Sequence, residues 1–133
     1  MRKIIIASHH RLAQGMADTL NFLSAYPNVS VLSAYVDEQN IDDQIQTIMS
    51  DTHDEEVFIF TDMLGGSVTQ KFVPYMNKNI HLICGMNLPL VLTFALGHEQ
   101  AYTKQEIQDL IQEAREAMLY VNTYEIMNQD DDE

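Results

Sequence analysis

The sequence contains little cysteine, little positive charge and no long hydrophobic run. Its single cysteine, Cys84, lies in the apolar stretch Ile80–Cys84, which favours a small buried side chain over a nucleophile. A lone buried cysteine fits a reducing compartment, so we expect a cytoplasmic protein. No apolar segment approaches the roughly 20 residues that span a bilayer. Only four apolar residues lie between the basic start and Ser8, so we expect neither secretion nor membrane insertion.

The scarcity of basic residues argues against nucleic acids and anionic membranes as partners. Seven Lys and Arg stand against 20 Asp and Glu, which gives a formal net charge of −13. Nucleic acids and anionic membrane surfaces would repel such a chain, whereas a protein with a basic docking face would be attracted. The 133 residues suffice for one core, and we predict a single domain over residues 1–127. The acidic run at 128–133 is predicted to be a disordered, solvated tail.

Strand-like and helix-like patterns alternate along the chain. The predicted strands are Ile4–Ala7, Val29–Tyr35, Val57–Thr61 and Ile80–Cys84, and apolar residues recur at helical spacing over 12–23, 41–49, 68–75 and 104–117. Short connections between alternating elements predict an α/β fold, a mostly parallel sheet with helices on both faces. Met118–Ile126 has β-branched and aromatic residues in rough alternation and is predicted to be a fifth strand that closes a sheet edge, its own or a neighbour's.

Polar residues follow two of these strands. Ser8, His9 and His10 come after the first, and the segment Asp62–Ser67, which contains Gly65 and Gly66, comes after the third. In open α/β sheets, ligands bind outside the carboxyl ends of the strands. A histidine, a carboxylate and a glycine-rich turn are therefore expected at one edge of the sheet.

The Gly65-Gly66-Ser67 turn has the composition of an anion site. Glycines let backbone amides converge on a ligand, and a following helix favours negative charge, so phosphate would suit this position. The triplet is equally typical of a tight strand-to-helix turn in which Ser67 caps the helix. No lysine follows at Walker spacing and the Gly-x-Gly-x-x-Gly pattern is absent, so nucleotide binding is disfavoured.

Together these residues suit phosphoryl transfer through histidine. A neutral imidazole is a nucleophile, and the reference pKa of histidine, about 6.5, leaves that form in excess at neutral pH. Asp62 could accept a hydrogen bond from one ring nitrogen of His9, fix the tautomer and stabilise the cationic ring. The structural alternative is that His9 only ends a strand and Asp62 only begins a turn.

The other histidines, His53, His81 and His98, are scattered, and no spacing predicts a metal site. Asn87 and Pro89 follow the fourth strand, where they either shape the wall of the active crevice or form a turn.

The order of strand-Ser8-His9, strand-Asp62-x-x-Gly65-Gly66-Ser67 and strand-Gly85-Met86-Asn87-Leu88-Pro89 resembles the IIA component of the mannose-class sugar phosphotransferase system. The likeness covers about Met1 to Ala117. It implies that His9 takes a phosphoryl group from the carrier protein HPr and passes it to a IIB component, with Asp62 as its partner and Ser67 in contact with the phosphate. It also implies a homodimer that exchanges an antiparallel last strand, and no cofactor, because the phosphoryl group arrives activated.

Two positions depart from the family pattern. His10 stands where the family commonly has glycine, so two imidazoles compete for the nucleophile's role. Alignment with the strand and Ser8 favours His9, while His10 would begin the turn and modulate its neighbour. Val68 stands where proline commonly follows the turn, a change expected to alter only the opening of the helix.

Two functions follow from the resemblance. The first is a phosphohistidine carrier for sugar uptake, and the second is a regulatory domain whose phosphorylation at His9 controls a partner protein. A chain without a fused DNA-binding or ATPase segment favours the first. A phosphocarrier that serves dihydroxyacetone kinase is a third option, for which we expect a different turn after Asp62.

Overall fold

Strands and helices alternate from the start of the chain. The computed structural model describes residues 1–52 and 55–124. In chain order the elements are β1 (Lys3–His9), α1 (Leu12–Ser24), β2 (Val29–Ala34), α2 (Ile41–Ser50), β3 (Val57–Thr61), α3 (Ser67–Phe72), the 3₁₀ turn η1 (Val73–Tyr75), β4 (Ile80–Ile83), α4 (Leu88–Leu96) and α5 (Lys104–Arg115). They form two compact units, Met1–Ala101 and a second that begins at Tyr102. The single domain over 1–127 stays a prediction, and the tail at 128–133 lies outside the described residues.

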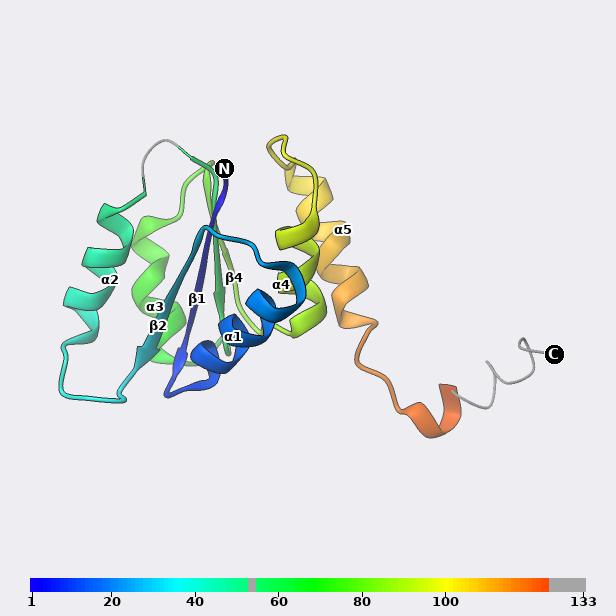
Figure 1. Cartoon of the computed structure of the whole chain (residues 1–133), viewed down its shortest axis with the longest axis horizontal. Coiled ribbons are helices and arrows are strands. Elements are labelled where there is room, and N and C mark those ends of the chain that lie inside the picture. The colour runs from blue at the N-terminus through cyan, green and yellow to red at the C-terminus, as the bar shows by residue number, and fades with distance from the viewer. Residues whose placement is uncertain (53–54, 125–133) are drawn as a thin grey trace. The chain divides into compact units, whose positions relative to one another are not determined.

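The four strands form one parallel sheet in the order β2-β1-β3-β4. Helices α1 and α4 cover one face of this sheet, and α2 and α3 cover the other (Figure 1). The predicted α/β architecture with helices on both faces is confirmed. Because both faces are covered, the central strands β1 and β3 are buried along almost their whole length and consist of nearly continuous apolar residues.

Side chains of each strand alternate between the two faces. Ile5 and Ile59 belong to the core beneath α2 and α3. Phe58 and Phe60 point to the opposite face, where their ring centroids lie 4.5 and 5.7 Å from that of Phe94 on α4. Each such buried side chain contributes on the order of 1.5–3 kcal/mol of transfer free energy. The alternation therefore fixes which face every residue of β1 and β3 presents.

Specific side chains begin and end the helices. Asn40 begins α2 and Asn87 begins α4, where its side-chain oxygen accepts from the Leu90 N–H at 2.9 Å. At the other end of α4, the buried Arg2 donates through Nη1 to the Phe94 carbonyl at 2.9 Å. The start of the chain is thereby attached to the end of this helix.

The second unit contains α5, which begins with a capping box. The Glu106 N–H donates to Thr103 Oγ1 at 3.1 Å, and the Thr103 N–H donates to Glu106 Oε1 at 2.9 Å. Because both bonds are local, the sequence alone determines where this helix starts.

The predicted fifth strand is not formed. Within the predicted Met118–Ile126, residues 118–120 are irregular and 121–124 form a helical turn, while 125–126 lie outside the described residues. The Tyr120 carbonyl accepts from the N–H groups of the third and fourth residues after it, at 3.1 and 3.3 Å. These local bonds satisfy backbone groups that a strand can satisfy only against a neighbouring strand. The antiparallel last strand and its exchange in a dimer are therefore unsupported.

Strand order determines where a site can form. The chain leaves β1 toward β2 on one side and returns to β3 on the other, so β1 and β3 are neighbours whose connections diverge. Such a switch point opens at the carboxyl ends of the two strands, where parallel α/β sheets bind ligands. Both predicted polar segments, after β1 and after β3, lie at this edge.

Candidate active site

His9 is the last residue of β1 and lies against Asp62, the first residue after β3. One carboxylate oxygen, Asp62 Oδ2, accepts from the backbone N–H of His9 at 2.8 Å and lies 2.8 Å from its ring nitrogen Nδ1. The other oxygen accepts from the Met63 N–H at 3.0 Å. Both predicted residues are therefore in contact, and the carboxylate fixes the backbone and the ring of His9 together.

The protonation of Asp62 determines which ring nitrogen of His9 carries the proton. Burial raises the pKa of this carboxyl, but hydrogen bonds from the backbone and ring of His9, together with the ring's charge, outweigh burial and lower it. An ionised carboxylate can only accept, so Nδ1 carries the proton. In the neutral ring, Nε2 therefore keeps its lone pair. The His9 side chain is 33% exposed and that of Asp62 only 10%, so the ring is accessible while its partner is shielded.

Gly66 lies against the Cε1 edge of the His9 ring. A Cβ at this position would be 2.4 Å from His9 Cε1 and 3.2 Å from Nε2, closer than packed atoms tolerate. Its backbone, with φ of −91°, suits any residue, so the requirement for glycine comes from the close approach alone. Gly65 differs, because a Cβ there would meet nothing within 4 Å. Of the two glycines that the sequence singled out, only Gly66 is so close to the imidazole that a Cβ would overlap with it.

A threonine pair closes the turn between β3 and α3. Thr69 Oγ1 lies 2.7 Å from Thr61 Oγ1 and donates to the Met63 carbonyl at 2.7 Å. Both threonines are buried. These bonds fix the turn that carries Asp62, Gly66 and Ser67, a role that the sequence analysis did not assign to either threonine.

Tyr35 is the main residue that the sequence analysis missed. It directly follows β2, and its hydroxyl lies 2.6 Å from Ser67 Oγ. Its ring centroid lies 5.8 Å from that of His9, with the planes inclined by 33°. Strand order was the missing information: once β2 is known to neighbour β1, the residue after β2 is expected beside the residue after β1.

Ser8 and His10 shape the turn after β1. The Ser8 side chain is fully buried; its hydroxyl accepts from the Ala13 N–H at 2.7 Å and donates to the His10 carbonyl at 2.9 Å. His10 is exposed and has φ of 55°, so it begins the turn as predicted. Ser8 thus supports the backbone beneath the histidines, and a place for Ser8 and His10 as wall or modulator of the site stays a prediction.

The other predicted residues lie at the start of α4. Asn87 caps this helix and Pro89 stands in its first turn, where the fixed φ of proline suits a helix. A place in the wall of the site stays a prediction for both. His81 pairs with Glu56, with Nε2 and Oε2 3.2 Å apart, and His53 lies outside the described residues.

Over residues 1–52 and 55–124, no group of three or more His, Cys, Asp or Glu side chains is arranged to hold a metal ion. The same part of the chain contains no helix that is both long enough and apolar enough to cross a membrane.

The arrangement has the chemistry that a nucleophilic imidazole requires. A shielded carboxylate holds one ring nitrogen, the ring itself is one-third exposed, and a glycine backbone and two hydroxyl groups lie nearby. Such a site can form a covalent bond at Nε2 and stabilise the positive ring that results.

Comparisons with known proteins agree with this geometry. Residues 3–115 match the family model EIIA-man, described as the phosphotransferase system (PTS) fructose IIA component. A Klebsiella pneumoniae protein, described provisionally as a phosphoenolpyruvate-dependent sugar PTS permease, has 28% identity and a TM-score of 0.84 over 91% of each chain. No match was found among curated protein sequences.

More distant structures share the fold. The PTS IIA protein associated with a fucose utilization operon of Streptococcus pneumoniae has 20% identity and a TM-score of 0.74, over 92% of this chain and 95% of its own. The mannose/sorbose-specific IIA subunit of Enterococcus faecalis has 16% identity and a TM-score of 0.73, over 89% and 92%.

Proposed function

This chain belongs to the family of PTS fructose IIA components, and from that membership we propose that it is a phosphohistidine carrier: His9 accepts a phosphoryl group from phospho-HPr and passes it to a IIB component during sugar uptake. The observation that carries the proposal is the contact of Asp62 Oδ2 with His9 Nδ1 at 2.8 Å. This contact directs the lone pair of Nε2 away from the carboxylate, as an attack on phosphorus requires.

In the forward step, His9 Nε2 attacks the phosphorus of phosphohistidine on HPr. A new N–P bond forms at Nε2, the N–P bond of HPr breaks, and its electron pair returns to the imidazole of HPr. The His9 ring becomes cationic because Nδ1 keeps its proton, and Asp62 stabilises this charge. A hydrogen bond to a charged group contributes about 1.5–3 kcal/mol. Transfer to IIB is the same step in reverse, with a residue of IIB as the acceptor.

The turn after β3 has two roles in this proposal. Gly66 has no Cβ, which lets the backbone of the turn approach the ring beside Nε2. The Ser67 hydroxyl and the backbone amides of Gly65–Ser67 donate to phosphoryl oxygens, which form strong hydrogen bonds because they are charged.

The proposal includes the partners and the setting. With a net charge of −13, the chain would attract a basic docking face on HPr and so speed the encounter. HPr, a IIB component and a second copy of this chain in a homodimer are the expected partners. A cytoplasmic location belongs to the same proposal, because HPr delivers the phosphoryl group there.

The experiment starts from purified chain, enzyme I, HPr and labelled phosphoenolpyruvate. Wild type and His10→Ala are expected to take up acid-labile label, while His9→Ala takes up none. Addition of a IIB component should then discharge the labelled wild type. Label lost only in His10→Ala would move the nucleophile to His10. A labelled protein that no IIB component discharges would favour the regulatory alternative.

A further inference from the structure

The contact between Tyr35 and Ser67 joins two strand ends beside the proposed nucleophile. Tyr35 follows β2 and Ser67 begins α3, and their oxygens lie 2.6 Å apart. A hydroxyl group has one proton to donate and can accept as well. If Tyr35 donates to Ser67 Oγ, the Ser67 proton is available for a third group, and the Tyr35 bond restricts where that proton points.

The backbone of Tyr35 is held in an uncommon conformation. Its φ is 67°, in the left-handed region that bulky side chains rarely adopt. Surrounding contacts must maintain such a conformation, and it is more frequent at functional sites than elsewhere. The conformation brings the Tyr35 ring beside that of His9, with centroids 5.8 Å apart.

We propose that Tyr35 is a positioning residue for phosphoryl transfer: its hydroxyl donates to Ser67 Oγ and thereby directs the Ser67 proton to a phosphoryl oxygen on His9 Nε2. The inference rests on the proposed function and assigns this step to a hydrogen-bonded chain, Tyr35 to Ser67 to phosphoryl group. Tyr35 acts through Ser67, so its contribution exists only while the serine hydroxyl is present.

The measurement is the equilibrium distribution of label between HPr and this chain. Purified phospho-HPr is mixed with each variant without enzyme I, and label on both proteins is counted at equilibrium. The equilibrium constant depends only on the separate proteins, so a side chain that merely contacts HPr during docking cannot change it. A contact with the phosphoryl group does change it, because only the phosphorylated chain makes that contact.

The variants are Tyr35→Phe, Ser67→Ala and the double variant. Tyr35→Phe is expected to shift the equilibrium toward phospho-HPr by about two- to tenfold, the range of a single hydrogen bond. Ser67→Ala should shift it at least as far, and Tyr35→Phe should add nothing in the Ser67→Ala background. Thermal unfolding of each variant shows that it folds.

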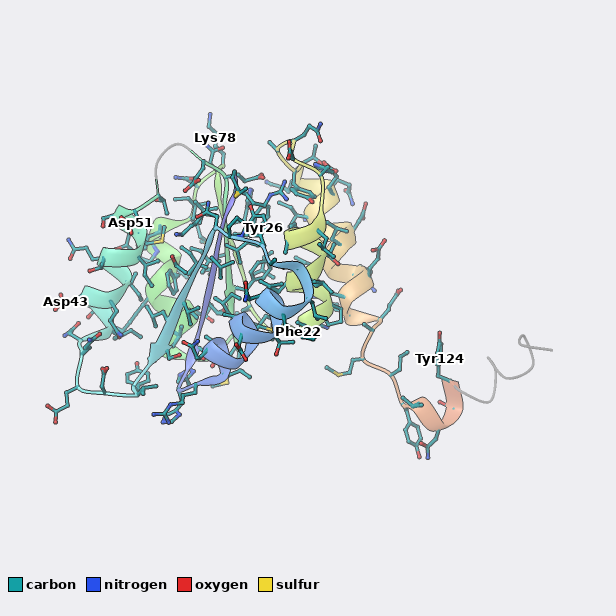
Figure 2. The ribbon with its side chains drawn as sticks, viewed as in Figure 1. Phe22, Tyr26, Asp43, Asp51, Lys78 and Tyr124 are labelled. Carbon is teal, nitrogen blue, oxygen red and sulfur yellow. The ribbon has the colours of Figure 1, made fainter. Side chains whose placement is uncertain are left out.

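Tyr26→Phe is the matched control. The Tyr26 hydroxyl donates to the Arg2 carbonyl at 2.6 Å, the same length as the contact under test. Figure 2 shows Tyr26 near the amino ends of the strands, away from their carboxyl ends. This variant should unfold at a lower temperature and leave the distribution of label unchanged.

The outcomes distinguish a failure of this inference from a failure of the proposed function on which it rests. Wild type that takes no label from phospho-HPr would overturn the proposed function and this inference with it. A labelled wild type with an unchanged constant in Tyr35→Phe overturns the inference alone. If Tyr35→Phe only raises the KM for phospho-HPr, the residue contacts the partner instead. Effects that multiply in the double variant would show that Tyr35 acts independently of Ser67.

Discussion

Replacement of Gly66 by alanine should slow phosphoryl uptake. An added Cβ would lie 2.4 Å from His9 Cε1, whereas ordinary contact begins at 3.4 Å, so the ring or the turn must move by the difference, 1.0 Å. The ring cannot swing aside freely, because Asp62 Oδ2 holds both its Nδ1 and the backbone N–H at 2.8 Å.

The predicted magnitude follows from the bond that breaks. A 2.8 Å contact stretched by 1.0 Å no longer qualifies as a hydrogen bond. Loss of a hydrogen bond to a charged group costs about 1.5–3 kcal/mol, which corresponds to uptake from phospho-HPr slowed by about 10- to 150-fold. The same bond is present in the folded protein, so its loss also lowers the free energy of unfolding. That loss is offset only in part, because alanine adopts φ of −91° without strain and the replacement of a glycine at such a position commonly gains about 0.4–1 kcal/mol.

The assay compares the rate of label uptake and the melting temperature for Gly66→Ala and Gly65→Ala. Gly65 is the matched control, because a Cβ there meets nothing within 4 Å. Gly65→Ala keeps the backbone amide that the proposal assigns to the phosphoryl group, so it should take up label at the wild-type rate. If Gly66→Ala does so too, the close approach to His9 does not matter for transfer and the reasoning fails. Equal losses in both variants would show that the turn needs flexibility instead of space.

Three further predictions concern Asp62 and Ser8. Asp62→Asn should slow label uptake at least about tenfold, since a neutral amide stabilises the cationic ring less; a wild-type rate would exclude the carboxylate from the reaction. The fold lowers the pKa of Asp62. The ionised carboxylate therefore stabilises the folded protein fully above the unfolded pKa of about 3.9, and this contribution is lost as pH falls through the lower folded pKa. When the free energy of unfolding is measured from pH 6 to pH 2, Asp62→Asn should lose less of it than wild type. Ser8→Ala should reduce the free energy of unfolding by about 1–3 kcal/mol, because it leaves the Ala13 N–H and the His10 carbonyl without their partner; an unchanged denaturation midpoint would contradict this role.

The strands were predictable because burial on both faces produces continuous apolar runs. Val57–Thr61 is observed with the predicted bounds, and β1 extends the predicted Ile4–Ala7 by one residue at its start and two at its end. His9 and Asp62 were predictable for a related reason. A polar residue directly after a buried strand must lie at the carboxyl edge, where parallel strands end together.

The residues that were missed or misassigned depend on partners that sequence does not specify. Tyr35 becomes a neighbour of His9 only through the strand order β2-β1-β3. Gly65 and Gly66 are the same residue type in sequence, and only the path of the turn shows that one touches the ring. Met118–Ile126 has the composition of a strand, yet β propensity takes effect only where another strand offers hydrogen bonds.

Register is what brings the site together. Along β1, Ala7 is paired with Thr61 of β3, and His9 is paired with Ala34 of β2. Asp62 and Tyr35 each follow one of these partners directly, so both flank His9 from opposite sides. Because side chains alternate with a period of two, a slip of β1 by one residue would turn His9 to the other face of the sheet and would move Ile5 out of the core beneath α2 and α3. The apolar residues that form the core therefore also set the positions of the proposed nucleophile, its carboxylate and its tyrosine.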